Sequence, residues 1–145
     1  MRFMRFDDRL QVRLEPGEEV AARLLQLLEA EEVGYAAITG LGALSSIKLA
    51  YWARESREYE VHQIEEQVEL VSLVGNAAMR EGKPALHLHA SIGRRDLSLL
   101  GGHVIAAVAN PNVELWLHPE PQAVTREIDP GCGLPLMQLP ERLDD

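Results

Sequence analysis

The sequence predicts a single α/β (α+β) domain in which one main helix packs on a mostly antiparallel, barrel-like sheet. Three observations support this fold class. One stretch repeats its apolar residues with the period of a helix. Most of the remaining chain consists of short runs in which apolar and polar residues alternate, as is typical of strands. The turns between these runs are short, which favours antiparallel neighbours because parallel strands need long crossovers. No linker or repeat interrupts residues 1–145, so we expect one domain.

A first strand is expected over residues 4–14. Its apolar residues share one parity, which places them on one face of an extended chain, and Asp8 is the single interruption. These residues are Met4, Phe6, Leu10, Val12 and Leu14. A turn at Glu15-Pro16-Gly17 ends the strand.

The one long helix is expected over residues 18–31. Its apolar residues recur at helical spacing and give one apolar face: Val20, Leu24, Leu27 and Leu28. Glu18 and Glu19 suit the positive end of the helix dipole, and Gly34 suits a C-terminal stop.

The rest of the chain is expected to form strands. They cover residues 35–39, 47–52, 59–64, 68–74, 85–92, 104–109, 113–117 and 124–128. Turns are expected at Gly40-Leu41-Gly42, Glu81-Gly82-Lys83-Pro84 and Asn110-Pro111.

Charge and composition exclude several classes of function. The formal net charge is −9, with 14 basic against 23 acidic residues, and the longest basic cluster is the pair Arg94-Arg95. Nucleic-acid affinity depends on Lys and Arg at phosphates, so direct DNA binding is not expected. There is no apolar run of about 18 residues and no signal-peptide core, so we expect a cytoplasmic protein without membrane contact. Cys132, the one cysteine, cannot form an internal disulfide.

Residues 86–92 contain the most informative motif. In a strand, the alternating apolar residues face the core, and His87 and His89 share the other face. Their Cα atoms would lie about 6.5–7 Å apart, from where two imidazoles can bind one metal ion at roughly 2.0–2.1 Å each. His103 follows Gly101-Gly102 and would come beside the pair on a returning strand. Three histidines with an open position are typical of zinc sites that bind a further ligand.

Two alternatives remain open at this motif. Histidines at alternate positions also occur as polar residues on a solvated sheet face, without metal. The same three ligands would also accept Ni²⁺, Cu²⁺ or Fe²⁺. Since bound imidazoles must be neutral, metal affinity should fall below about pH 6.5.

Other candidates have weaker support. Glu69 and Glu114 lie within apolar strands and are the candidate proton-transfer residues if the protein is an enzyme. Residues 40–45 begin like a dinucleotide fingerprint, but Ser45 replaces the third glycine and no helix follows, so such a site is not expected. No base can be assigned to Cys132, and His62 and His118 are interpreted as surface or half-buried residues.

Several motifs, taken in order, resemble the plants-and-prokaryotes conserved (PPC) domain family over nearly the whole chain. They are Gly40-Leu41-Gly42-Ala43-Leu44-Ser45, Glu69-Leu70-Val71-Ser72-Leu73-Val74-Gly75, His87-Leu88-His89-Ala90-Ser91, Gly101-Gly102-His103 and Val113-Glu114-Leu115. The resemblance implies a PPC-like fold, a homotrimer, and zinc bound by the matching residues His87, His89 and His103. The chain has no AT-hook, and in the stretch Glu66-Gln67-Val68-Glu69-Leu70 only Glu69 matches the partner-binding motif of plant members. In fold, the chain is also distantly similar to acetolactate decarboxylase.

Three functional hypotheses follow. The first is a zinc-binding homotrimeric domain with a regulatory or ligand-binding role, which takes a small-molecule ligand at the metal. The second is a zinc-dependent small-molecule lyase or hydrolase, in which the metal polarises a carbonyl or activates water. The third is a DNA-associated regulator that acts through a partner.

Overall fold

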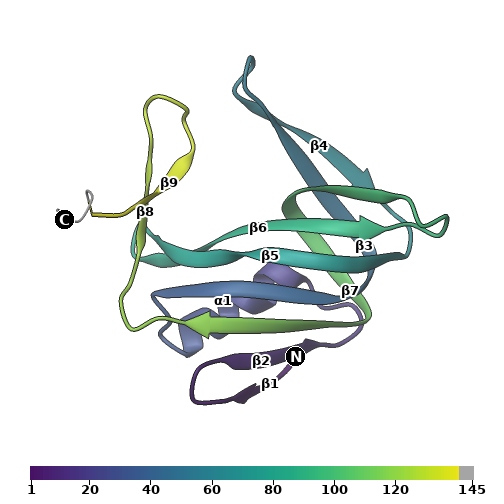
Figure 1. Ribbon diagram of the computed structural model, residues 1–145, viewed down its shortest axis with the longest axis horizontal. Coiled ribbons are helices and arrows are strands. Elements are labelled where there is room, and N and C mark those ends of the chain that lie inside the picture. The colour runs from purple at the N-terminus through teal and green to yellow at the C-terminus, as the bar shows by residue number, and fades with distance from the viewer. Residues whose placement is uncertain (141–145) are drawn as a thin grey trace, which may run out of the picture.

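The computed structural model describes residues 1–140, which contain one helix and a nine-stranded sheet (Figure 1). The elements are β1 (Arg2–Arg5), β2 (Leu10–Leu14), α1 (Val20–Ala30), β3 (Tyr35–Ala53), β4 (Glu58–Ile64), β5 (Val68–Arg80), β6 (Lys83–Gly93), β7 (Leu99–Pro119), β8 (Thr125–Ile128) and β9 (Pro135–Gln138). Among these residues, no helix has the length and apolar character needed to cross a membrane.

Four long strands close a ring. β3 pairs with β5 and β7, and β6 also pairs with β5 and β7, all antiparallel. The other strands lie outside this ring, so only part of the sheet belongs to it and the sheet is not a clean barrel. One pair is parallel, where Met79 of β5 meets Thr125 of β8. The predicted fold, a mostly antiparallel sheet with one helix, is confirmed.

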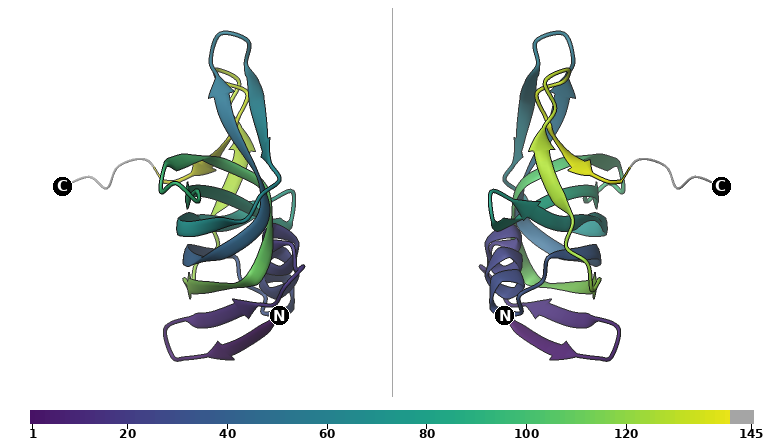
Figure 2. Two further views of the ribbon diagram at one scale, coloured as in Figure 1. Left: turned by 90° about the vertical axis from the view of Figure 1, so that its right-hand side faces the viewer. Right: turned by 90° about the vertical axis from the view of Figure 1, so that its left-hand side faces the viewer.

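Two hairpins project from the same side of the ring, one formed by the end of β3 with β4, the other by β8 with β9 (Figures 1 and 2). The β1–β2 hairpin lies on the opposite side, and α1 packs against β6 and β7. The candidate site lies between the two projecting hairpins.

The helix forms as its apolar periodicity predicts. Val20, Leu24, Leu27 and Leu28 are all buried in the core. Glu19 caps the N-terminus, because its carboxylate accepts a hydrogen bond from the Ala22 backbone N–H at 2.6 Å. The same carboxylate accepts from the Ala107 N–H at 3.1 Å, which ties the start of α1 to β7.

The predicted helix stop at Gly34 is wrong. The residue with a positive φ after the helix is Glu32, at 53°. Gly34 is needed for close approach instead, since a Cβ there would lie 2.6 Å from the Cβ of Ala123.

The single strand predicted over residues 4–14 is also wrong, because the chain reverses inside it. The Phe6 N–H donates to the Arg9 carbonyl at 2.8 Å and closes the turn between β1 and β2. Met4 and Phe6 are 60% and 41% exposed, so only the apolar residues of β2 reach the core.

The turns predicted at residues 40–42 and at Asn110-Pro111 are absent, because β3 and β7 continue through both places. The register of β3 shifts between Gly40 and Gly42 against β5, and again after Gly42 against β7. Gly42 has a φ of 147°, and a Cβ there would lie 2.4 Å from the Asn112 carbonyl oxygen. Glycine therefore accommodates a β-bulge here, which bends a long strand without ending it.

Candidate metal centre

Successive side chains of β6 point to opposite faces of the sheet, as the sequence predicts. Leu88, Ala90 and Ile92 are buried in the core, whereas His87 and His89 are exposed on the outer face. The local period of the strand is sufficient to place both imidazoles on one side of the sheet.

His103 joins them from β7, where it is the direct cross-strand partner of His89. On its other side it pairs with Ala50 of β3. The two preceding glycines allow this approach. A Cβ at Gly101 would lie 2.9 Å from the Ala90 carbonyl oxygen, and one at Gly102 would lie 2.9 Å from that of Ala50. Larger residues would push β7 away from both neighbours.

The three rings form a nearly equilateral triangle, with centroids 5.2, 5.3 and 5.4 Å apart. One nitrogen from each ring can be chosen so that all three lie within 4.8 Å of one another. Tetrahedral zinc with bonds of roughly 2.0–2.1 Å needs donors about 3.3 Å apart. Rotation of the imidazoles would have to bring these nitrogens closer together for all three to bind one ion.

The surroundings keep two of the rings neutral. Burial lowers the pKa of His103 to about 4, with a further contribution from His87 and His89. Burial also lowers the pKa of His87, assisted by the charge of Arg126 and by His89. The Nδ1 atom of His103 is buried and has no hydrogen-bond partner among residues 1–140. A neutral imidazole with a buried, unpaired nitrogen fits a metal ligand, since metal ions bind the deprotonated nitrogen.

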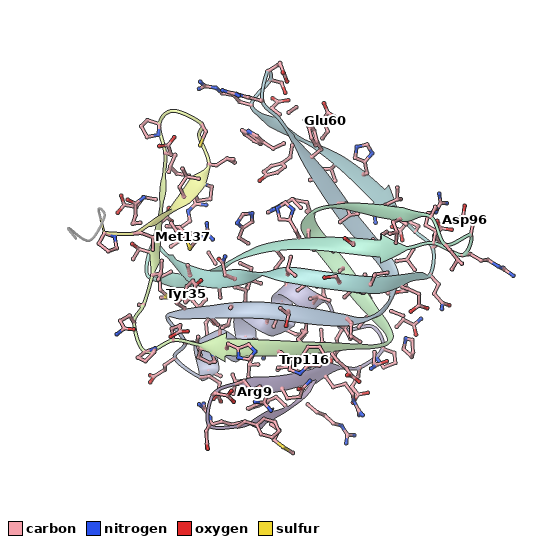
Figure 3. All side chains as sticks on the ribbon, viewed as in Figure 1. Arg9, Tyr35, Glu60, Asp96, Trp116 and Met137 are labelled. Atoms are coloured by element: carbon pink, nitrogen blue, oxygen red, sulfur yellow. The ribbon has the colours of Figure 1, made fainter. Side chains whose placement is uncertain are left out.

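The two projecting hairpins supply the walls of the site, and sequence reasoning did not find their residues. The Tyr59 ring of β4 stacks on His103 at 5.0 Å, and Trp52 packs edge-on against Tyr59 at 4.9 Å. On the other side, Arg126 of β8 hydrogen-bonds Asn76 of β5. Figure 3 labels Glu60 on β4 and Met137 on β9, which mark the two hairpins. The short turn between residues 52 and 59 could have indicated the aromatic hairpin, but no sequence signal pointed to Arg126.

The carboxylates considered as catalytic candidates do not join the cluster, which within residues 1–140 consists of three histidines. Glu69 is exposed and pairs in register with Gly93, four residues beyond His89 on β6. Glu114 lies on β7 opposite Leu41 of β3.

The other candidates also lie apart from the histidines. His62 is exposed and His118 half-buried, as expected. The backbone N–H of Cys132 donates to Asp129 in the loop between β8 and β9. Residues 40–45 lie inside β3, which continues as a strand to Ala53.

Comparison with known proteins identifies the fold family. The sequence profile of the Plants and Prokaryotes Conserved (PCC) domain, the family named PPC above, matches residues 1–119. A solved PPC protein from Pyrococcus horikoshii is 27% identical, with a TM-score of 0.86 over 97% of this chain and 96% of that one. A metal-containing protein from Archaeoglobus fulgidus is 28% identical, with a TM-score of 0.84 over 96% of this chain and 100% of that one.

Two further structures extend the comparison at the level of the fold. A proposed DNA-binding protein from Bacteroides thetaiotaomicron is 24% identical, with a TM-score of 0.92 over 94% of this chain and 96% of that one. A Staphylococcus aureus protein similar to α-acetolactate decarboxylase is 12% identical, with a TM-score of 0.57 over 80% of this chain and 54% of that one. The predicted resemblances to the PPC family and, distantly, to acetolactate decarboxylase are thus confirmed. No curated protein matches the chain.

Proposed function

The chain belongs to the Plants and Prokaryotes Conserved domain family, and we propose that it binds one divalent transition-metal ion, zinc before others, in a regulatory or ligand-binding role. His87, His89 and His103 would hold the ion. The observation that carries the proposal is the triangle of imidazoles, in which His103 presents a buried nitrogen without a hydrogen-bond partner. The metal-containing relative from Archaeoglobus fulgidus supports the same interpretation.

Three histidines would leave at least one coordination position open. When bound, the ion would act there as a Lewis acid toward a small-molecule ligand. Neutral imidazoles carry no charge, so the ion would keep its double positive charge at the site. Tyr59 and Trp52 border the site on the side of His103. His87 and His89 lie on the exposed face of β6.

A binding role has better support than a lyase or hydrolase. Catalysis of either kind needs a proton-transfer group within hydrogen-bond reach of the reacting atoms. In the described part of the chain, neither Glu69 nor Glu114 belongs to the histidine cluster. Direct duplex binding is not proposed, because the net charge of −9 opposes phosphate contacts.

The proposal includes a homotrimer, as the family resemblance implies. Physical support comes from apolar side chains left exposed on the ring. Val71 and Leu99, 53% and 65% exposed, lie on either side of Gly93, and both would contact a Cβ placed there. Leu97 and Leu100 lie close by in sequence and are 86% and 42% exposed. Such patches are commonly covered by another subunit.

Metal analysis of the purified chain tests the proposal. After chelator treatment and reloading with Zn²⁺, we expect close to one tightly bound ion per chain by elemental analysis. His103→Ala should lose most of this zinc because it removes one of three donors. His62→Ala is the matched control, since His62 lies on exposed β4 outside the cluster and should leave the zinc content unchanged. Absence of zinc from the unaltered chain, or equal zinc in both variants, would contradict the proposal.

A further inference from the structure

Arg126 carries a buried positive charge that no carboxylate within residues 1–140 neutralises. Its side chain belongs to a residue only 7% exposed, and the described ion pairs do not include it. Its Nε atom is buried without a hydrogen-bond partner. A guanidinium removed from water is costly unless its charge and its N–H groups are satisfied. This residue therefore has an unused capacity to bind an anion.

The guanidinium lies beside the histidine cluster. One terminal nitrogen, Nη2, donates to the Asn76 Oδ1 atom at 2.6 Å, and Nη1 donates to the Pro135 carbonyl at 3.0 Å. Asn76 is the cross-strand partner of His87, so both side chains lie on the outer face of the β5–β6 pair. Arg126 therefore contacts the residue that lies directly opposite His87 on the neighbouring strand.

The polar groups on this side of the site favour negative charge. Because the Asn76 oxygen accepts from Arg126, its amide nitrogen remains as a donor. A divalent ion on three neutral imidazoles would add two positive charges next to one guanidinium. An anion would compensate the charge of both groups.

We propose, on the basis of the metal site proposed above, that the natural ligand of this site is a small carboxylate anion that binds the open metal position and pairs with Arg126. Arginine suits this role because its N–H groups match the two oxygens of a carboxylate. Within residues 1–140, the sheet register joins the β8–β9 hairpin to the ring where Met79 pairs with Thr125. Because Nε is buried there, an anion would reach it only after the hairpin moves. Arg126 lies beyond residues 1–119, the part of the chain that matches the family profile.

Calorimetric titration of the zinc-loaded chain tests the inference. The probes are malonate, succinate and glutarate, each compared with its uncharged diamide in a chloride-free buffer. We expect at least one dicarboxylate to bind about tenfold or more tightly than its diamide, and more tightly than to metal-free protein. Equal binding of acid and amide, or no binding of any dicarboxylate, would overturn the inference. These comparisons use the unaltered chain and require no variant to fold.

Substitution then assigns the effect to Arg126. Arg126→Gln removes the charge and should weaken dicarboxylate binding about tenfold or more, while the zinc content stays near that of the unaltered chain. Arg94→Gln is the control, because Arg94 is exposed and pairs with Glu66, and it should change neither quantity. Equal dicarboxylate affinity in zinc-loaded Arg126→Gln and the unaltered chain would overturn the inference and leave the metal site intact. A chain that binds no zinc would instead contradict the proposed function.

Discussion

At the scale of single residues, burial lowers the pKa values of His87 and His103 more than neighbouring charges do. The burial of His103 lowers its pKa to about 4, and burial is also the main cause of the lowered pKa of His87. In both rings the neutral form is favoured, and the neutral form is the one that binds a metal ion. This effect could not be predicted from the sequence, because the burial of a side chain depends on the strands around it.

The first prediction at this scale concerns pH. Metal retention should persist below the ordinary histidine pKa of about 6.5 and be lost as the pH approaches 4, since His103 takes up a proton near there. The ordinary histidine pKa alone would instead place the loss of metal below about 6.5. Equilibrium dialysis of ⁶⁵Zn at a series of pH values measures it. A midpoint at or above the ordinary value would contradict the pKa shift.

The free energy of unfolding of the metal-free chain should also decrease as the pH falls. The folded-state pKa of His103 lies below its unfolded value, so the unfolded chain binds more protons between the two. The stability that neutral His103 contributes is complete above about pH 6.5. It is lost as the pH falls toward the folded-state pKa of about 4. Urea unfolding with and without His103→Ala separates this contribution from that of the carboxylates.

At the scale of elements, the β5–β6 pair determines the position of the histidine motif. Gly75 of β5 lies opposite Leu88, the residue between the two histidines. A Cβ at Gly75 would lie 2.0 Å from the His87 carbonyl oxygen and 2.9 Å from the Leu88 Cα. Both are backbone atoms, which cannot move without moving the strand.

We therefore predict that Gly75→Ala separates β5 from β6 at the metal centre. It should lower the free energy of unfolding by about 1–3 kcal/mol, the usual effect of overpacking, and weaken zinc binding as well. Urea unfolding and zinc titration measure the two effects. Gly93→Ala is the matched control on β6, because its Cβ would meet a side-chain atom, Val71 Cγ2 at 3.3 Å, which can move. Equal zinc affinity in both variants would show that strand spacing does not control the site.

At the scale of the whole molecule, one helix covers only part of the sheet. It packs on β6 and β7, and apolar side chains elsewhere on the ring stay exposed, including Val71 and Leu99. Exposed apolar surface is unfavourable by roughly 25 cal/mol per Å², so a cyclic assembly that covers it would be stabilised.

The prediction at this scale is a stable homotrimer with a mass three times 16.1 kDa in light scattering. Leu99→Asp should dissociate it, because a charged carboxylate would then be buried in the interface. Met4→Asp is the control, since Met4 is 60% exposed on β1, away from the proposed interface. A monomeric mass for the unaltered chain would refute the assembly. A trimer that survives Leu99→Asp would place the interface elsewhere.

Features that depend on local periodicity were predictable without knowledge of any long-range contact. The apolar face of α1 follows from a period of 3.6 residues, and the shared face of His87 and His89 follows from the period of two in a strand. Both need only neighbouring residues, so both could be predicted before any contact between elements was known. The strands expected over residues 59–64, 68–74 and 85–92 likewise lie within β4, β5 and β6.

Contacts between distant residues, in contrast, follow from packing and strand register. Glycine and proline at residues 40–42 and 110–111 are compatible with a turn or with a bulge, and the register against neighbouring strands selects the bulge at Gly42. The same long-range pairing brings His103 against His89, and places Arg126 beside His87 through Asn76. Such contacts form between segments far apart in the chain, where packing and register, rather than local sequence pattern, determine the neighbours.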